Sequence, residues 1–362
     1  MDNIEFRALA IPASIHSTDA EDFMTMVDIR NAIYREINGN DDETMTAAEL
    51  LPYLQPDPDE IHLVWLIVAD GQPVGRLGID IPLEDGSRTA YWIIEILRSH
   101  WSLGIGTAAL RIVEQTAREH GRSLVQSWAQ HGEPSAQEDE TASDRLVSPT
   151  GFGTIPRDHI ARFYLRHGYT LGQIERKSAL ALNGSLSLVE QLLATAQPVG
   201  YSLVRWMVPT PPEHRDGYAW MKSRMSTDVP AGSMEFDEET WDAERVTRSD
   251  HRWLDGGHTV LVTAARHDAT GDLVAFTELA IGEDVTGPTN QIDTLVVNEH
   301  RGHRLGQWIK CANLLAWQEI APRSQKVLTY NAEENRHMLN VNEAMGFQPV
   351  AYIGAWKKVL DI

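Results

Sequence analysis

The sequence has little cysteine, no long apolar run and a deficit of positive charge. Its 362 residues contain one cysteine, Cys311, so the chain cannot form an internal disulfide, which favours a reducing compartment. No stretch approaches the ~18 consecutive apolar residues of a membrane-spanning helix. The first residues lack the basic start and long apolar centre of a signal peptide. The sequence therefore predicts a cytoplasmic protein with no membrane partner.

The charge balance narrows the range of partners. There are 52 acidic and 31 basic residues, which gives a formal net charge of −21. Such a surface would repel the phosphates of a nucleic acid, so no nucleic-acid partner is expected, whereas cationic ligands would be attracted. A metal site is not expected either, because His300 and His303 have no further ligands at a metal-binding spacing.

The predicted elements occur twice in the same order. Each half is predicted to form a strand, two helices, three strands, a glycine-rich corner, a helix, a strand, a helix and a strand. Each half also has a glycine followed by an aromatic residue after its last helix, at 168–169 and 346–347. Repetition of this kind indicates two related domains, and a chain of this length can bury a core in each.

We therefore expect a first domain at 1–181, a turn-rich linker at 182–200 and a second domain at 201–362. Each domain is expected to have an α/β (α+β) fold with a mixed, mostly antiparallel sheet flanked by helices. The polar stretch 132–158 has little to bury. It is expected to form either a surface loop or a lid over a substrate site.

A glycine-rich corner separates a strand from a helix in each half, at 103–107 and 301–306. The start of a helix offers unpaired backbone N–H groups and a partial positive charge, and glycine lets a pyrophosphate approach the backbone. Neither corner is a Walker A loop or a dinucleotide fingerprint, because GxxxxGK[ST] and a third glycine are absent. In the second corner, Arg301, His303 and Arg304 add positive charge, which indicates an anion site.

These corners resemble those of the GNAT superfamily of acyl-CoA N-acyltransferases. The superfamily corner, [Q/R]-x-x-G-x-[G/A], is similar to residues 301–306 in the second half and 101–106 in the first. A later motif, N-x-x-A-x-x-x-Y-x-x-x-G-F, resembles residues 335–347 and 157–169. The resemblance spans nearly the whole chain and implies two GNAT-like domains that use acetyl-CoA as co-substrate.

The two halves depart from the family pattern in different ways. The first keeps both glycines and the tyrosine, Tyr164, but has Trp101 in place of arginine or glutamine. The second keeps the arginine, but has Arg304 where glycine is usual and Asn342 where the family tyrosine serves as an acid. The first half thus resembles the family more closely at the acid, and the second half at the anion site. The sequence does not show which half is catalytic.

The resemblance also implies which residues bind the cofactor. They belong to the corner, to the strand before it and to the start of the last helix. In the first half they are Ile96, Leu103, Gly104, Ile105, Gly106 and Thr107. In the second half they are Leu295, Val296, Val297, Arg301, Gly302, His303, Arg304, Leu305, Gly306, Asn331 and Asn335.

Acyl transfer to an amine requires few catalytic groups. A base or a water chain must take a proton from the amine, and the departing thiolate must be protonated or solvated. In the first half, Glu95 is the candidate base and Tyr164 the candidate acid. In the second, Glu278 and Asp293 are the candidate bases, because burial of Glu278 in its apolar run would raise its pKa. Each also fits a structural role, as a paired or exposed carboxylate or as a core tyrosine.

These features favour an N-acetyltransferase. In this interpretation the acetyl group passes from acetyl-CoA to a primary amine of a small, cationic molecule by direct attack. Two alternatives remain: the acceptor is a protein amine, or the chain binds acyl-CoA without catalysis. A monomer or a homodimer is expected, since tandem domains can pack together within one chain.

Overall fold

The first half of the chain forms strands, flanking helices and a small hairpin in the computed structural model, which describes residues 3–131 and 144–361. Its elements are β1 (Ile4–Ala8), α1 (Glu21–Asn38), α2 (Ala47–Leu54), β2 (Glu60–Ala69), β3 (Gln72–Pro82), β4 (Thr89–Ile96), η1 (Arg98–His100), α3 (Ile105–Glu119), β5 (Leu124–His131), β6 (Arg145–Val147), β7 (Thr154–Pro156), α4 (His159–Arg166) and β8 (Thr170–Ala181). The polar stretch expected to be a loop or lid contains the β6–β7 hairpin. Residues 132–143 of that stretch lie outside the described residues.

The second half repeats this order. Its elements are α5 (Ser187–Thr195), β9 (Tyr201–Met207), α6 (Pro212–Asp228), α7 (Ala243–Asp255), β10 (Thr259–His267), β11 (Leu273–Ile281), β12 (Thr289–Val296), η2 (Asn298–His300), α8 (Leu305–Ile320), β13 (Lys326–Ala332), α9 (Arg336–Met345) and β14 (Gln348–Val359). The segment expected to be a turn-rich linker contains α5, whose Val189 is buried against the second half. Helix α7 begins after Asp242, which caps it by accepting a hydrogen bond from Arg245 N.

The two halves share one twelve-stranded sheet, in the order β1-β2-β3-β4-β5-β14-β8-β13-β12-β11-β10-β9. Among the described residues, parallel pairing is confined to β4–β5 and β12–β13. This confirms the predicted α/β class with a mixed, mostly antiparallel sheet. Among the same residues, no helix combines the length and apolarity needed to cross a bilayer.

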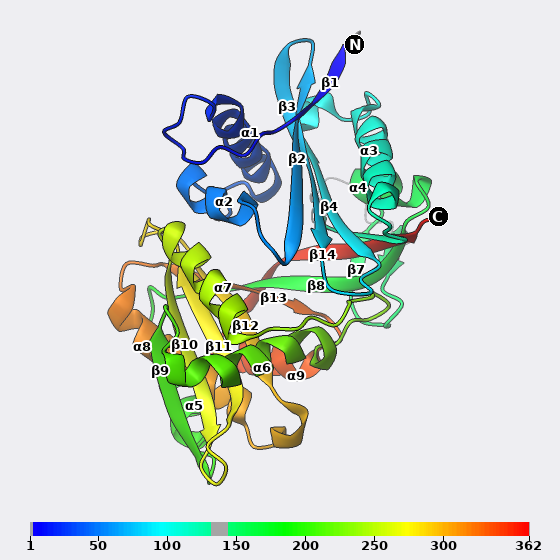
Figure 1. Cartoon of the computed structure of the whole chain (residues 1–362). Helices are drawn as coiled ribbons and strands as arrows, with labels where there is room; N and C mark the ends of the chain where they lie inside the picture. The colour runs from blue at the N-terminus through cyan, green and yellow to red at the C-terminus, as the bar shows by residue number, and fades with distance from the viewer. Residues whose placement is uncertain (1–2, 132–143, 362) are drawn as a thin grey trace.

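The last strand of each half lies beside the other half. β14 pairs with β5, β8 pairs with β13, and β8 and β14 pair with each other in the middle of the sheet. Figure 1 shows β14 and β8 running side by side between the blue and cyan upper half and the yellow and orange lower half. Any cavity at the edge of β5 is therefore bordered by second-half residues. The domain boundary predicted at 182–200 stays a prediction.

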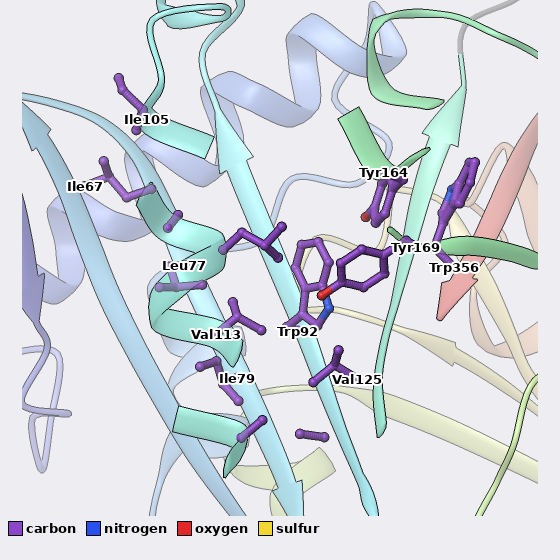
Figure 2. Close-up of a cluster of buried hydrophobic side chains, with 14 of the residues drawn as sticks. Ile67, Leu77, Ile79, Trp92, Ile105, Val113, Val125, Tyr164, Tyr169 and Trp356 are labelled. Atoms are coloured by element: carbon purple, nitrogen blue, oxygen red, sulfur yellow. The ribbon is translucent and has the colours of Figure 1, made fainter. Parts of the chain in front are cut away.

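Helices cover both faces of the first-half sheet because its strands alternate their side chains. Val64, Leu66 and Val68 of β2 pack against α1 and α2, whereas Ile67 and Ala69 belong to the core beneath α3 and α4. Figure 2 shows this second core, in which aromatic side chains from α4, β4 and β14 meet. α1 and α4 therefore lie on opposite faces of the sheet.

Candidate active site

A cavity opens where two parallel strands of the first half diverge. β4 and β5 pair at residues 89–91 and 124–126, and beyond these pairs a cavity of about 790 Å³ lies between them. Residues 92–96 of β4 and 127–130 of β5 line it, together with parts of α1, α3, α4, β8, β13 and β14. Where the strands separate, backbone groups leave the sheet ladder and become available to a ligand.

The first corner opens onto this cavity at the start of α3. Ser102 and Gly104 both have left-handed backbone conformations, with φ of 62° and 85°. A Cβ on Gly104 would meet open space, whereas a Cβ on Gly106 would lie 3.1 Å from the Phe163 ring on α4. Glycine is therefore suited to position 104 because of the left-handed backbone there, whereas Gly106 allows α4 to pack close to α3.

The second corner has the same backbone conformation, and its residue numbers are 200 higher than those of the first. Gly302 and Arg304 are left-handed, with φ of 86° and 58°. Each corner thus needs two left-handed residues and has glycine at one of them. A Cβ on Gly306 would meet Val296 at 3.6 Å, an ordinary contact, so the close packing that requires Gly106 does not recur there.

Trp101 and Arg301 make the same contact in the two corners. Trp101 Nε1 donates to the carbonyl of Ile96 at 2.8 Å, and Arg301 Nε donates to the carbonyl of Val296 at 3.1 Å. Both carbonyls lie at the end of the strand that precedes the corner. Trp101 therefore replaces the arginine of the family pattern without loss of this hydrogen bond.

The positive charges of the second corner are turned toward protein carbonyls. Arg301 also donates to Asp228 O at the end of α6, and Arg304 donates to Thr195 O at the end of α5. Cations are stabilised at the negative ends of helices. The ring of His303 packs 5.6 Å from the ring of Tyr201.

The first-half cavity has its own cations. Arg98 follows β4, and Arg162 and Arg166 lie one turn apart on α4; all three line the cavity. Sequence reasoning missed them because they lie outside the family motif positions. Arg162 and Arg166 lie four residues apart within the later motif at 157–169, and this helical spacing was the signal that could have indicated a pair of cations on one face.

Tyr164 lies in the cavity wall beside the point where the strands separate. Its hydroxyl is hydrogen-bonded to Ser127 Oγ on β5 at 2.8 Å, and its ring stacks on Trp356 of β14 at 4.8 Å (Figure 2). Burial raises the pKa of Tyr164 above that of an ordinary phenol. The side chain is therefore a protonated phenol with its hydroxyl next to the strand edge.

Glu95 is held in a buried ion pair. Arg76 Nε on β3 donates to Glu95 Oε2 at 2.5 Å. Burial by itself would raise the pKa of Glu95, but the charge and hydrogen bond of Arg76 lower it below its usual value. A carboxylate held ionised in this way is a weak proton acceptor, which argues against the role of base expected for Glu95.

Three further carboxylates that line the cavity, Glu36, Glu43 and Glu175, were missed by sequence reasoning. Glu43, in the loop after α1, is bonded by Lys177 Nζ and Tyr330 O–H, so its loop is tied to β8 and β13. Glu175 on β8 accepts a hydrogen bond from Trp128 Nε1 at 2.8 Å. Burial raises the pKa of Glu175 above its usual value. A single glutamate within a predicted strand carries no pattern that could have marked it.

The comparisons with known proteins agree with this geometry. The pattern of the Acetyltransferase (GNAT) family matches residues 24–138, which include β4, the first corner and β5. A tandem GNAT protein from the clavulanic acid biosynthesis pathway, solved without AcCoA, is 24% identical, with 99% of both chains covered and a TM-score of 0.73. Residues 24–138 thus match the GNAT family, and the whole chain shares the fold of a tandem GNAT protein.

Other GNAT proteins share the fold at lower identity. A GCN5-related N-acetyltransferase from Sphaerobacter thermophilus is 14% identical, with 99% of this chain and 96% of that chain covered and a TM-score of 0.64. A GCN5-related glucosamine N-acetyltransferase region of a fungal multi-domain GH3 beta-N-acetylglucosaminidase is also 14% identical, with 98% of this chain and 38% of that chain covered and a TM-score of 0.57. No curated protein matches the sequence.

The predicted bases of the second repeat lie together around one cation. Lys222 Nζ of α6 contacts Glu278 at 3.0 Å and Asp293 at 2.7 Å, and the Tyr218 hydroxyl donates to Glu278. Burial and the neighbouring Asp293 carboxylate raise the pKa of Glu278 well above its usual value. Lys222, Glu278, Asp293 and Tyr218 are therefore hydrogen-bonded or paired with one another within the second repeat.

Other polar side chains of the second repeat, including the predicted Asn331 and Asn335, also have partners within the protein. Asn342, which replaces the family tyrosine, is buried and donates to Asn331 Oδ1 at 2.7 Å. Asn335 caps α9 by accepting a hydrogen bond from Met338 N. Lys310 of α8 is buried and donates to Gln291 of β12 at 3.1 Å. Each of these side chains therefore bonds to a protein group, although Asn342 Oδ1 is buried and has no hydrogen-bond partner among the described residues.

Proposed function

We propose that the chain transfers an acetyl group from acetyl-CoA to a primary amine of a small, cationic molecule by direct attack, in the first repeat. The cavity between the diverged strands β4 and β5 carries this proposal, because the corner, the freed strand edge and Tyr164 all border it. The N–H groups at the start of α3 and the cations of α4 suit the pyrophosphate and other phosphates of coenzyme A.

The reacting groups would be arranged along β4. The pantetheine arm would lie against the separated strand edge, and the backbone around Ile96 would hold the thioester. Backbone N–H groups aimed at the carbonyl oxygen stabilise the charge that develops on it. Tyr164, kept protonated by burial, is suited to give its proton to the departing thiolate.

Three observations favour a small cationic acceptor over a protein amine. Carboxylates and aromatic rings line the cavity, including Glu43, Glu175, Tyr34 and Trp128. Tyr330 and Ile353 of the second half also line it, so the far wall is closed by the other repeat. One relative with the same fold is described as a glucosamine N-acetyltransferase region, which is an enzyme for a small primary amine.

The test measures acetyl-CoA binding by calorimetry on one matched pair of corner variants. Gly104→Asp places a carboxylate at the helix start, and we expect affinity to fall at least ~100-fold. Gly104→Asn is the control, because asparagine has nearly the same shape and also tolerates the left-handed backbone. Arg304→Asp makes the corresponding change in the second corner and is expected to leave affinity within about threefold.

Loss of binding in Arg304→Asp but not in Gly104→Asp would move the cofactor site to the second repeat. A wild-type chain with no binding heat for acetyl-CoA would refute acyl transfer by either repeat. Retained binding with no acetylated product would favour the non-catalytic alternative.

A further inference from the structure

The carboxylates that line the cavity differ in their partners. Glu43 pairs with Lys177 and Glu95 pairs with Arg76, whereas Glu36 is exposed to solvent and accepts a hydrogen bond from Arg98 N at 2.9 Å. Glu175 accepts only the Trp128 indole hydrogen bond described above, and within residues 3–131 and 144–361 no ion pair involves it. Of the four, Glu175 is therefore the carboxylate best able to receive a cation or a proton from a ligand.

Glu175 and Tyr164 lie on opposite faces of the sheet. Ser127 of β5 points toward Tyr164 on the α4 face, so the next residue, Trp128, points toward the α1 face. Trp128 holds Glu175, which places Glu175 on the α1 face as well. A thioester in the gap between β4 and β5 would thus have a carboxylate on one side and a phenol on the other.

We propose that Glu175 accepts the proton of the acceptor's ammonium group, which binds on the α1 face beside Trp128; this rests on the proposed function. Proton transfer gives a neutral amine and a protonated Glu175 carboxyl. The amine nitrogen then forms a bond to the thioester carbonyl carbon, and the carbon–sulfur bond breaks as the tetrahedral intermediate collapses. The nitrogen releases its remaining extra proton to solvent. The thiolate takes a proton from Tyr164, which is reprotonated from solvent, and Glu175 releases its proton to solvent, which restores both side chains.

Residues of the second half also line the cavity on the side where Glu175 lies. Ile353 of β14 lies directly opposite Glu175 of β8 in the sheet register, and both line the cavity. Tyr330 of β13 lines the same wall and donates to Glu43. Because β8 lies between β14 and β13, Glu175 is positioned by strands of the second repeat. The acceptor site therefore belongs to both repeats, although the cofactor corner belongs to the first.

The test compares Glu175→Gln, Glu175→Asp and Glu319→Gln, with acetyl-CoA as donor and with putrescine, glucosamine and a lysine-containing peptide as probe acceptors. Glutamine keeps an oxygen for Trp128 N–H but cannot take a proton. We expect Glu175→Gln to lower kcat by about 10²–10⁴-fold, while acetyl-CoA affinity stays within about threefold and Tm is unchanged. Glu175→Asp should recover part of kcat. Glu319→Gln removes the same charge from an exposed position on α8 and should leave kcat unchanged.

The pH profile separates a catalytic from a structural role. Wild-type kcat should rise with pH as Glu175 ionises and then level off. The kcat of Glu175→Gln should lack this rise and should instead continue to increase at higher pH, as the free amine deprotonates. A Glu175→Gln variant that keeps more than a third of wild-type kcat, or keeps the wild-type limb, overturns the role of Glu175 alone. A wild-type chain that binds acetyl-CoA but acetylates no probe overturns the amine transfer, and the role of Glu175 with it.

Discussion

The same cross-strand position carries an ion pair in the first repeat and an apolar pair in the second. Arg76 on β3 faces Glu95 on β4, and 200 residues later Phe276 on β11 faces Leu295 on β12. Both pairs are largely buried in equivalent strands. The fold therefore does not require a charged pair at this position, and the ion pair is best explained by the cavity that Glu95 lines.

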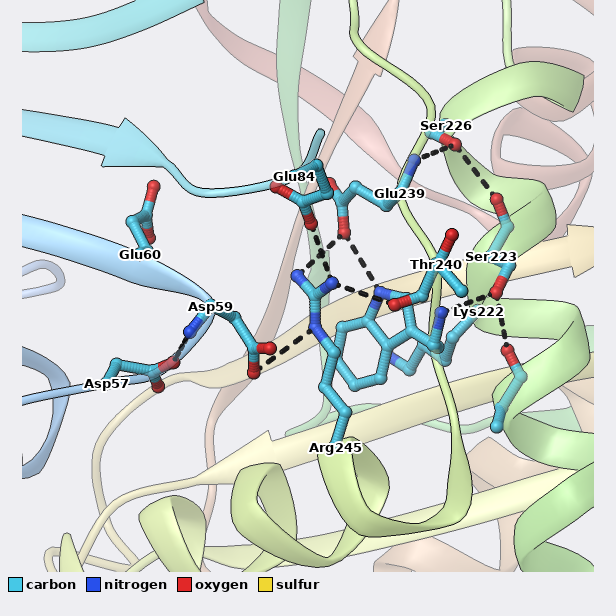
Figure 3. A network of polar contacts seen from close by, with 12 residues as sticks. Asp57, Asp59, Glu60, Glu84, Lys222, Ser223, Ser226, Glu239, Thr240 and Arg245 are labelled. Atoms are coloured by element: carbon cyan, nitrogen blue, oxygen red, sulfur yellow. Dashed lines mark hydrogen bonds and ion pairs between the residues drawn. The ribbon is translucent and has the colours of Figure 1, made fainter. Parts of the chain in front are cut away.

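At a second pair of equivalent positions the difference is reversed, because the charged residues lie in the second repeat. Gly78 of β3, which lies against Ile93, corresponds to Glu278 of β11, which lies beside Asp293. The first repeat is apolar there, whereas the second holds two carboxylates around Lys222. The repeats therefore share a backbone while each places its buried charges where the other has none. Lys222 and Arg245 both lie over the ring of Trp241, and Figure 3 shows Arg245 in a charged network with Asp59 and Glu84 at the junction of the repeats.

The largest expected effect comes from breaking the first-repeat ion pair. Arg76→Met leaves Glu95 buried and ionised, and we expect the free energy of unfolding to fall by about 3–5 kcal/mol in urea titrations. The double variant Arg76→Phe/Glu95→Leu copies the second-repeat pair and should stay within about 1 kcal/mol of wild type, because well-packed apolar residues can replace a buried pair. A double variant as unstable as the single one would show that the repeats are not equivalent at this position.

A smaller loss is expected when the second-repeat cation is removed. Lys222→Met leaves Glu278 and Asp293 without their cation, but Glu278 can take up a proton, so we expect a loss of about 2 kcal/mol at neutral pH. With its pKa raised by burial, folded Glu278 holds a proton that the unfolded chain releases above about pH 4.5. Stability therefore falls as pH rises through this window, and the variant should be closest to wild type near pH 5.

Urea titrations of Lys222→Met across pH test this directly. Lys222→Met/Glu278→Gln is the matched control, because it removes the titrating carboxyl and should remove most of the added pH dependence. A Lys222→Met variant whose deficit is constant with pH would contradict protonation of Glu278.

The smallest effect concerns the left-handed corner residues. Arg304→Gly should raise the free energy of unfolding by about 0.5 kcal/mol, because glycine adopts a φ of 58° without strain. Gly104→Ala makes the opposite change in the first corner and should cost about 1 kcal/mol. Thermal unfolding of both variants measures the difference. Equal shifts of the same sign would indicate that the two corners do not share one backbone path.

The element order and the corners could be predicted from the sequence, because they depend on local signals. Apolar periodicity indicated most strands and helices, and glycines marked both corners. Helix α5 was missed because turn residues surround its short apolar pattern, and the β6–β7 hairpin because its strands are three residues each. Tyr164 was found through a motif. Glu175, Arg98 and Tyr330 were missed, since nothing near them in the sequence indicates what they face.

The sequence by itself determined that this protein has two repeats with related folds and a glycine corner in each, because backbone conformation and side-chain periodicity are set over a few neighbouring residues. Only the tertiary structure decided that the cavity of about 790 Å³ lies between β4 and β5, and that Lys222, Glu278 and Asp293 of the second repeat bond to one another. It also decided that β14 pairs with β5 and β8 pairs with β13, so that Ile353 and Tyr330 line a first-repeat cavity and Trp356 stacks on Tyr164 in its wall. Those contacts join residues 150 or more positions apart, and they depend on strand order and register rather than on any local pattern.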